Sequence, residues 1–379
     1  MALTDMNDML AHAYRHGYAV GAFAIRDLES LTGVIAAAEA SRAPVLLVPE
    51  VADGMQLEVL LPAVESAASR AEVPVAIQAA VSSDPEAAAR LIRLGCNGLR
   101  VRELGDSFPQ SVQQVSEVVA TAHACGLSVE AEPGAHLVTT PAEAERFVDR
   151  SGIDSLRLDL GDGEDSGKGK LDHARLKRIH KALGAPLSVD AGEGLSENQY
   201  LRLIRNGVAA IGYSAPVPIT AAEAESVMRI WGAAGRAAEV LAQCTPWETA
   251  EQILLYNFPE LPEADTETAL ARGERVLRRI PGVREAVGMR ANLDEAPYHF
   301  AWRVRLCHPK ALSSFQHHPD HAAFTNGAIH PAIEGCTRIQ FSRTDTDKRT
   351  SPDPPEPPGQ EAVANKVTPL PPGTRRNLA

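Results

Sequence analysis

Short apolar or β-branched runs alternate with longer amphipathic segments between residues 18 and 243. The runs are predicted strands, and they lie at 19–25, 44–50, 74–81, 98–103, 127–134, 155–163, 186–194 and 209–215. Segments between them, such as LESLTGVIAAAEA, place apolar residues three and four positions apart, which indicates helices. A doubly wound open sheet alternates in the same way, but a count of eight strands favours the closed form. We therefore predict an α/β fold, a (β/α)8 TIM barrel over residues 1–243.

The regular alternation of predicted strands and helices ends after Thr245. Further strands are predicted at 247–258, 283–293, 298–306 and 336–342, with helices at 264–282 and in parts of 309–334. This βαββαβ order predicts an α+β, ferredoxin-like domain over residues 248–343. Eight of the 27 prolines lie between Pro352 and Pro372, among few residues that a core would bury. Residues 344–379 are therefore predicted to be a disordered, Pro-rich tail.

Composition narrows the class of protein. The chain has 37 basic and 49 acidic side chains and a net charge of −12, which argues against nucleic-acid binding. No apolar run reaches the roughly 18 residues of a membrane helix, and the N-terminus lacks the plan of a signal peptide. The five cysteines are scattered and form no CxxC pair, which is typical of reduced thiols. We expect a cytoplasmic protein with no membrane partner.

Charged side chains gather where the predicted barrel strands end, which is where barrel enzymes carry their chemistry. Residues two apart on a strand share a face. Glu130 therefore shares a face with Glu132, and Arg157 shares one with Asp159. The other strand-end residues that we single out are Glu50, Arg100, Arg102, Glu103, Asp190 and Tyr213. Converging carboxylates need a compensating cation. A divalent ion, the arginines themselves and a cationic substrate each satisfy this need.

Two glycine-rich stretches, 161–163 and 191–194, follow the sixth and seventh predicted strands. Backbone amides in such stretches can hold a phosphate. Here Asp162, Glu164 and Glu193 place negative charge at the same points. The charge therefore argues against a phosphorylated ligand.

The phrases GYAVGAFAIRDLESLTGVIAAAEASRAPVLL, AHACGLSVEAEPG and TPAEAERFVDRSGIDSLRLDLG resemble the class II fructose/tagatose-bisphosphate aldolase family over residues 1–235. The resemblance implies a barrel that splits or joins ketose bisphosphates through an enediolate bound to zinc. The family's zinc ligands are histidines in three strand-end motifs. This chain has Val81, Glu164 and Asp190 at those positions, and Ala80 replaces the family's catalytic aspartate. Zinc held by three histidines is therefore excluded, whereas Glu132 of the family's Glu-Leu-Gly motif is retained.

Carboxylates at two of the three ligand positions suggest an altered site. Glu132, Glu164 and Asp190 are predicted to form an oxygen-only metal site suited to Mg²⁺ or Mn²⁺. Such an ion would polarise a carbonyl group and stabilise an enolate. The candidate catalytic residues are Glu132, Glu130, Asp159, Arg102 and Tyr213, of which Glu130, Asp159 and Tyr213 are the candidate bases.

The phrase HHPDHAAFTNGAIHPAIEGCTRIQF, helped by YHFAWRVRL, resembles the stress-responsive dimeric α/β barrel (Dabb) family over residues 248–343. Members usually pair their sheets between two subunits, which implies a homo-oligomer. A few members cyclise polyketides with histidines, and His299 and His321 match two of those positions. The first-strand histidine is replaced by Gln252, and the helper tyrosine by Phe315.

Three functions follow from these features. The first is an aldolase-like carbon–carbon lyase that acts through an enolate on a small, non-phosphorylated carbonyl compound, in a specialised or biosynthetic pathway. The second is a non-catalytic ligand-binding or scaffold protein dimerised by the Dabb-like domain. The third is a cyclase or isomerase that uses His299 and His321 in the cavity of the second domain.

Overall fold

The computed structural model describes residues 2–51, 54–102, 105, 107–133, 140–158, 172–191, 195–213, 219–257, 263–292, 295–324 and 336–342. The predictions for Glu103, Asp159, Glu164 and the tail at 344–379 lie outside these residues. Within the described part of the chain, no helix is long and apolar enough to cross a membrane.

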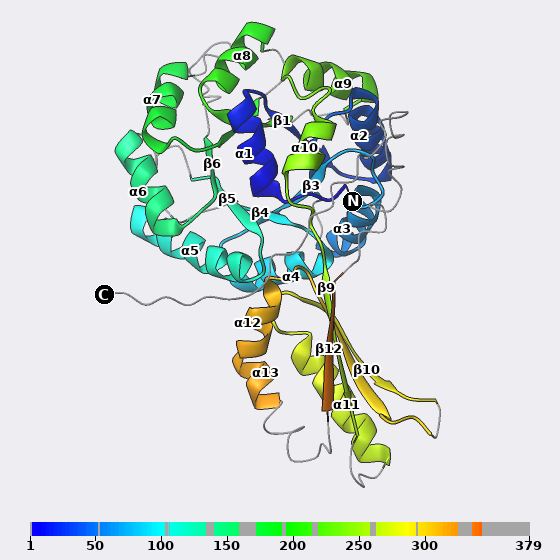
Figure 1. The fold of residues 1–379 in the computed structure, drawn as a ribbon. Coiled ribbons are helices and arrows are strands. Elements are labelled where there is room, and N and C mark those ends of the chain that lie inside the picture. The colour runs from blue at the N-terminus through cyan, green and yellow to red at the C-terminus, as the bar shows by residue number, and fades with distance from the viewer. Residues whose placement is uncertain are drawn as a thin grey trace, which may run out of the picture. The chain divides into compact units, whose positions relative to one another are not determined.

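Eight parallel strands close into a barrel in chain order, from β1 to β8 (Figure 1). The strands are β1 (Val20–Ile25), β2 (Val45–Pro49), β3 (Val75–Val81), β4 (Gly98–Val101), β5 (Ser128–Ala131), β6 (Ser155–Leu158), β7 (Leu187–Ala191) and β8 (Val208–Tyr213). Strands β2 and β4 are buried at every position, because one face packs inside the barrel and the other against helices. The predicted TIM barrel is confirmed.

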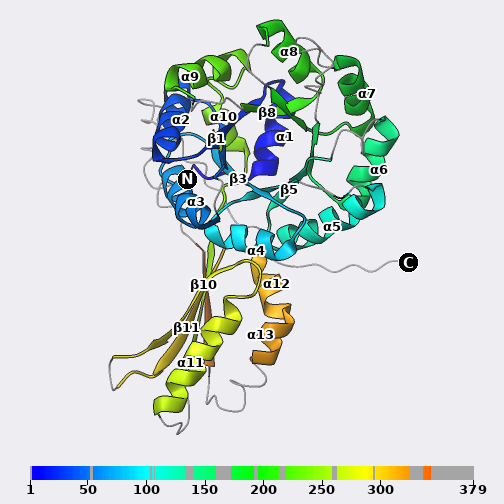
Figure 2. The same cartoon turned by 180° about the vertical axis from the view of Figure 1, so that it is seen from behind.

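Helices surround the strands, as Figures 1 and 2 show from opposite sides. They are α1 (Met6–His16), α2 (Leu28–Ser41), α3 (Gly54–Ala68), α4 (Pro85–Leu94), α5 (Phe108–Ala124), α6 (Pro141–Ser151), α7 (His173–Leu183), α8 (Glu197–Arg205), α9 (Ala221–Ile230) and α10 (Ala237–Gln243). Helices α1 and α10 lie across the end of the barrel that faces the viewer in Figure 1. The chain before α1 reaches the first residue of β3, where Leu3 pairs with Val75, so this is the N-terminal end of the strands. The opposite end carries the strand-end residues.

Local sequence explains where the helices begin and end, and α6 is an example. The Thr140 hydroxyl accepts a hydrogen bond from the Glu143 amide, and the Glu143 carboxylate accepts one from the Thr140 amide. Pro141 occupies the first helical position, where its missing N–H costs no hydrogen bond. Gly152 ends the helix at φ 73°, a conformation that glycine adopts without strain.

A four-stranded antiparallel sheet follows the barrel, with strand order β10-β11-β9-β12. Its elements are β9 (Ala250–Tyr256), α11 (Glu263–Leu277), β10 (Val283–Arg290), β11 (Phe300–Leu306), α12 (Ala311–His317), α13 (Pro319–Phe324) and β12 (Cys336–Ser342). This βαββαβ order with the first and third strands in the centre is the predicted ferredoxin-like topology, which is confirmed. The first of these strands begins three residues later than predicted, at Ala250.

The two faces of this sheet differ. Trp302 and Val304 of β11 are buried on the helix side, where the Trp302 ring meets Phe324 of α13 edge-on at 5.6 Å. The alternate residues face away from the helices, because successive strand residues point to opposite sides. There Arg303 forms ion pairs with Glu251 at 3.5 Å and Glu285 at 2.9 Å.

Candidate active site

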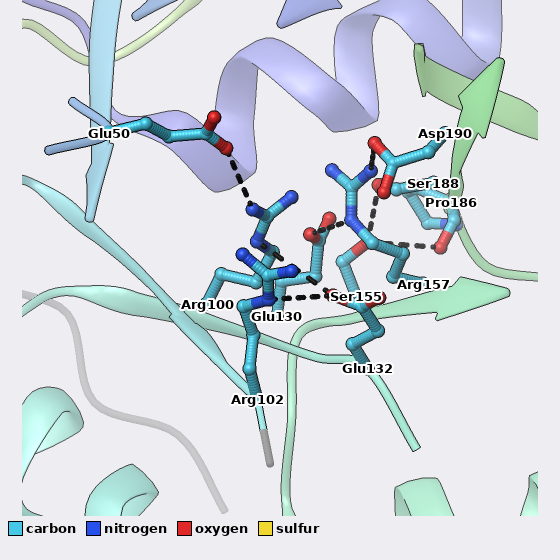
Figure 3. A network of polar contacts seen from close by, with 10 residues as sticks. All are labelled: Glu50, Arg100, Arg102, Glu130, Glu132, Ser155, Arg157, Pro186, Ser188 and Asp190. Carbon is cyan, nitrogen blue, oxygen red and sulfur yellow. Dashed lines mark hydrogen bonds and ion pairs between the residues drawn. The ribbon is translucent and has the colours of Figure 1, made fainter. Parts of the chain in front are cut away.

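A network of arginines and carboxylates occupies the C-terminal end of the barrel (Figure 3). Arg100, Glu130, Arg157 and Asp190 lie on β4, β5, β6 and β7, respectively. Three further members, Glu50, Arg102 and Glu132, come directly after β2, β4 and β5. The register supports this convergence, because Arg100 lies beside Glu130 on the neighbouring strand.

The centre of the network is a buried ion-pair triad. Arg157 donates from Nε to Glu130 Oε1 and from Nη1 to Asp190 Oδ1, both at 2.6 Å. The side chain of Arg157 is 1% exposed and that of Glu130 is fully buried, whereas Asp190 is 47% exposed. Burial alone would lower the pKa of Arg157, but the two carboxylates raise it above its ordinary value. Arg157 is therefore a fixed cation.

Gly212 of β8 makes room for this triad. A Cβ atom at this position would lie 2.0 Å from Asp190 Oδ1 and 3.1 Å from Arg157 Nη1. Gly212 pairs with Asp190 in the strand register, so the backbone of β8 runs directly beside the carboxylate. Any other residue at position 212 would displace the Asp190 carboxylate.

Arg100 is buried, and its ion pairs are long. It is 4% exposed, and among the described residues it pairs with Glu50 Oε1, 3.5 Å from Nη2, and Glu132 Oε2, 4.0 Å from Nε. Its Nε has no hydrogen-bond partner among the residues that the structure describes. Burial, followed by the neighbouring Arg157 cation, lowers the pKa of Arg100 below its ordinary value. A buried guanidinium with such loose ion pairs is costly unless a ligand completes its hydrogen bonds.

The outer part of the network is more exposed. Arg102 Nε lies 3.4 Å from Glu132 Oε2, and Arg26 Nη2 lies 4.0 Å from Glu50 Oε2. Across the described residues, four arginines thus meet four carboxylates: Arg26, Arg100, Arg102 and Arg157 against Glu50, Glu130, Glu132 and Asp190. The sequence left three candidate cations open, and in the structure the guanidinium groups pair with these carboxylates.

A small pocket of about 70 Å³ opens beside this network. Ala22 and Ala24 of β1 and Gly212 of β8 leave the space, because their side chains are short or absent. The pocket is lined by Ala22, Ala24, Val48, Glu50, Arg100, Arg102, Asp190, Gly212 and Tyr213. The Tyr213 ring packs against Phe23 and Trp231, with its centroid 6.2 and 6.5 Å from theirs. The pocket therefore combines guanidinium groups, carboxylates and a phenol.

The structure separates the predicted site residues into groups. Arg102, Tyr213 and Asp190 line the pocket, whereas Glu132 lies beside it, paired with Arg102. Glu130 does not line the pocket, because Arg157 holds it in the barrel interior. Asp159 and Glu164 lie outside the described residues.

Two pocket residues were absent from the predicted catalytic set. Arg100 lies two positions before Arg102 and shares its face of the strand. The two-residue repeat of a strand would therefore have placed Arg100 in the predicted catalytic set. Glu50 was recognised at a strand end but had no partner assigned. Its pairing with Arg100 joins β2 to β4, and this is a tertiary contact.

The described residues do not fit the family's zinc site. Val81 offers no donor atom, and Asp190 Oδ1 is already bound by Arg157. Glu132 lies next to the Arg102 cation, which would repel a divalent ion. No group of three ligands suited to a metal occurs among the described residues. The site of Glu132, Glu164 and Asp190 stays a prediction, because Glu164 is not described.

A family model described as fructose-bisphosphate aldolase class-II matches residues 4–229. The chain belongs to this family. A fructose-bisphosphate aldolase from Geobacillus stearothermophilus is 34% identical over 230 residues, covering 56% of this chain and 80% of that protein. A fructose-bisphosphate aldolase from Thermus caldophilus is 33% identical over 199 residues, covering 48% of this chain and 65% of that protein. Membership of the class II aldolase family implies aldolase-type carbon–carbon lyase chemistry.

A solved aldolase structure is similar to the barrel. The YdjI aldolase from Escherichia coli K12 is 25% identical, with a TM-score of 0.56, covering 62% of this chain and 99% of that one. The C-terminal region is similar to a Dabb family protein with a ferredoxin-like fold from Mesorhizobium loti, at 20% identity. That match has a TM-score of 0.24 and covers 25% of this chain and 95% of that one. The ferredoxin-like topology of this region rests on its strand order, β10-β11-β9-β12.

The two histidines predicted for the second domain lie on different elements. His299 directly precedes β11, and its amide donates to Asn257 Oδ1 at 2.7 Å. His321 lies on α13, with its ring centroid 4.6 Å from that of Phe315. Burial lowers the pKa of His321 below its ordinary value. Gln252, at the position of the first-strand histidine, is buried and lies 3.5 Å from Gln316 Nε2.

Proposed function

We propose that the barrel is an aldolase-type lyase that breaks or forms a carbon–carbon bond through an enolate, acting on a small carbonyl compound that carries no phosphate. The observation that carries this proposal is Arg100, a buried guanidinium that lines the pocket and whose Nε has no hydrogen-bond partner in the described part of the chain. Arg102 lines the same pocket. Preorganised guanidinium groups stabilise the negative charge that develops on an enolate oxygen.

Asp190 is the base in this proposal. It lines the pocket, and the bond from Arg157 to Oδ1 fixes its orientation. In the cleavage direction, the Asp190 carboxylate takes the proton of the substrate hydroxyl, and the carbon–carbon bond breaks. The electron pair moves onto the enolate oxygen beside Arg100 and Arg102, and the Tyr213 hydroxyl gives a proton to the enolate carbon. The proton taken by Asp190 then passes through solvent to the Tyr213 phenolate, which restores both residues.

The charge near the pocket supports a substrate without phosphate. Three carboxylates line the pocket or flank it, and each already forms an ion pair with an arginine: Glu50, Asp190 and Glu132. A phosphate dianion in this space would bring two negative charges close to all three carboxylates, whereas a single carboxylate group brings one, so the repulsion opposes the phosphate more strongly. A Mg²⁺ or Mn²⁺ ion at Glu132, Glu164 and Asp190 remains a separate proposal, and no step above depends on it.

Deuterium exchange tests enolate formation directly. We expect the full chain to exchange the α-protons of at least one member of a panel of small ketones and 2-oxo acids in D₂O. Proton NMR would follow this loss in protein treated with EDTA, and again with added Mg²⁺ or Mn²⁺. His321→Ala should exchange at the rate of the unchanged protein. No exchange with any compound, with or without metal, would favour the scaffold function, and loss in His321→Ala would place the chemistry in the second domain.

We also propose that the chain self-associates through the sheet face opposite α11, α12 and α13. Register places Ile253 and Leu255 of β9 on that face with Ile339 and Phe341 of β12. Ile339 is 37% and Phe341 47% exposed, which is high for large apolar side chains on a sheet. Light scattering should give a mass of two chains or more, and Phe341→Asp should lower it. A monomer at micromolar concentration would contradict the proposal.

A further inference from the structure

Arg100 and Arg102 form a pair of cations on one edge of one pocket. They lie two positions apart at the end of β4, so they share a face and their Cα atoms are about 6–7 Å apart. Arg102 is 46% exposed and ion-paired with Glu132, whereas the Arg100 side chain is 5% exposed. The two guanidinium groups therefore offer two adjacent anion positions, one at the rim and one inside.

The enolate of the proposed function uses one of these positions only. An enolate carries a single negative oxygen, and one guanidinium satisfies it. The other guanidinium would stay buried with carboxylates at 3.5 and 4.0 Å, longer than a charged hydrogen bond of about 2.7–2.9 Å. A second anionic group on the substrate would remove this deficit.

We propose that Arg100 binds a carboxylate group of the substrate, so that the compound taken by the barrel is a small 2-oxo acid. This inference rests on the proposed function and adds the substrate class to it. The planar guanidinium fork of arginine matches a carboxylate through two parallel hydrogen bonds. The carbonyl oxygen on the adjacent carbon then lies beside Arg102, where the enolate charge develops.

The size of the pocket fits a small 2-oxo acid. A volume of about 70 Å³ leaves room for about five water-sized groups. A three-carbon oxo acid has six heavy atoms. The larger part of a longer substrate, which leaves as the aldehyde, would extend from the pocket.

The reaction balances without a co-reactant. In a 4-hydroxy-2-oxo acid, Asp190 takes the hydroxyl proton, C4 becomes an aldehyde carbon and the C3–C4 bond breaks. The electron pair forms the C2–C3 double bond, and the 2-oxo oxygen becomes the enolate. A proton returned to C3 gives a 2-oxo acid and an aldehyde, with no net oxidation or reduction.

Calorimetric titration of the full chain tests the carboxylate site without any turnover. The probes are pyruvate, oxalate as a planar mimic of its enolate, methyl pyruvate as the uncharged ester, and inorganic phosphate. We expect pyruvate and oxalate to bind, and methyl pyruvate to bind at least about tenfold more weakly. Arg100→Lys keeps the charge and loses the fork, so oxalate should bind about 10- to 100-fold more weakly. The matched control is Arg90→Lys, in a surface pair with Glu58, which should bind oxalate normally.

Other outcomes overturn either this inference or the proposed function, and they can be told apart. Equal binding of pyruvate and its ester would show that the carboxylate is not recognised, and this comparison needs no variant that must fold. Unchanged oxalate affinity in a folded Arg100→Lys would place the anion elsewhere, and phosphate binding more tightly than oxalate would indicate a phosphorylated substrate. Oxalate binding at Arg100 without any proton exchange would retain this site and refute the lyase. Exchange of a carboxylate-free ketone as fast as that of pyruvate would retain the lyase and refute this site.

Discussion

Replacing Arg157 by methionine should lower the free energy of unfolding by about 3–5 kcal/mol, because it leaves buried charge without a partner. Glu130 is fully buried and receives its 2.6 Å hydrogen bond from Arg157. Asp190 loses its bond to the same guanidinium. Urea denaturation at pH 7 would measure the change. The matched control is Arg90→Met, which breaks an exposed pair with Glu58 and should cost less than about 1 kcal/mol.

The free-energy deficit of Arg157→Met is measured against the unchanged protein under the same conditions. A deficit below about 1 kcal/mol at pH 7 would contradict the role of the triad.

The second large effect is expected on catalysis. Asp190→Asn should slow the exchange or cleavage reaction by about 10²- to 10⁴-fold, because the amide cannot accept the substrate proton. The side chain keeps its shape, and Arg157 keeps its bond to Glu130, so the fold should persist. The rate constant at saturation should fall while KM changes little, since the lost interaction acts in the transition state.

A matched control separates this effect from a change of surface charge. Asp149→Asn alters an exposed aspartate on α6, away from the pocket, and should react at the normal rate. Full activity in Asp190→Asn would refute its role as the base. If His321→Ala lost activity at the same time, the second domain would be the place of reaction.

Much of the barrel could be predicted from the sequence because its signal is local. Runs such as PVLLVPE are apolar on both faces, as a strand buried between a barrel interior and helices must be. The prediction that Glu130 and Glu132 share a face required only the two-residue repeat of a strand. The order of elements after Thr245 likewise indicated the ferredoxin-like topology.

The roles of those two glutamates could not be predicted. Glu130 is fully buried beside Arg157, whereas Glu132 lies near the rim with Arg102. This difference depends on the stagger between β5, β6 and β7, which the sequence of a single strand does not contain. The positions of Glu50 and Glu132 relative to β4 leave Arg100 Nε without a hydrogen-bond partner among the described residues, and this fact supports both proposals.

The sequence by itself determined the periodicity of strands and helices and the family of residues 4–229. Each of these is a property of residue types at fixed positions along the chain. The tertiary structure alone decided which cation balances which carboxylate and why position 212 is glycine. Those answers depend on distances of 2 to 4 Å between side chains on different strands, and closure of the barrel sets those distances.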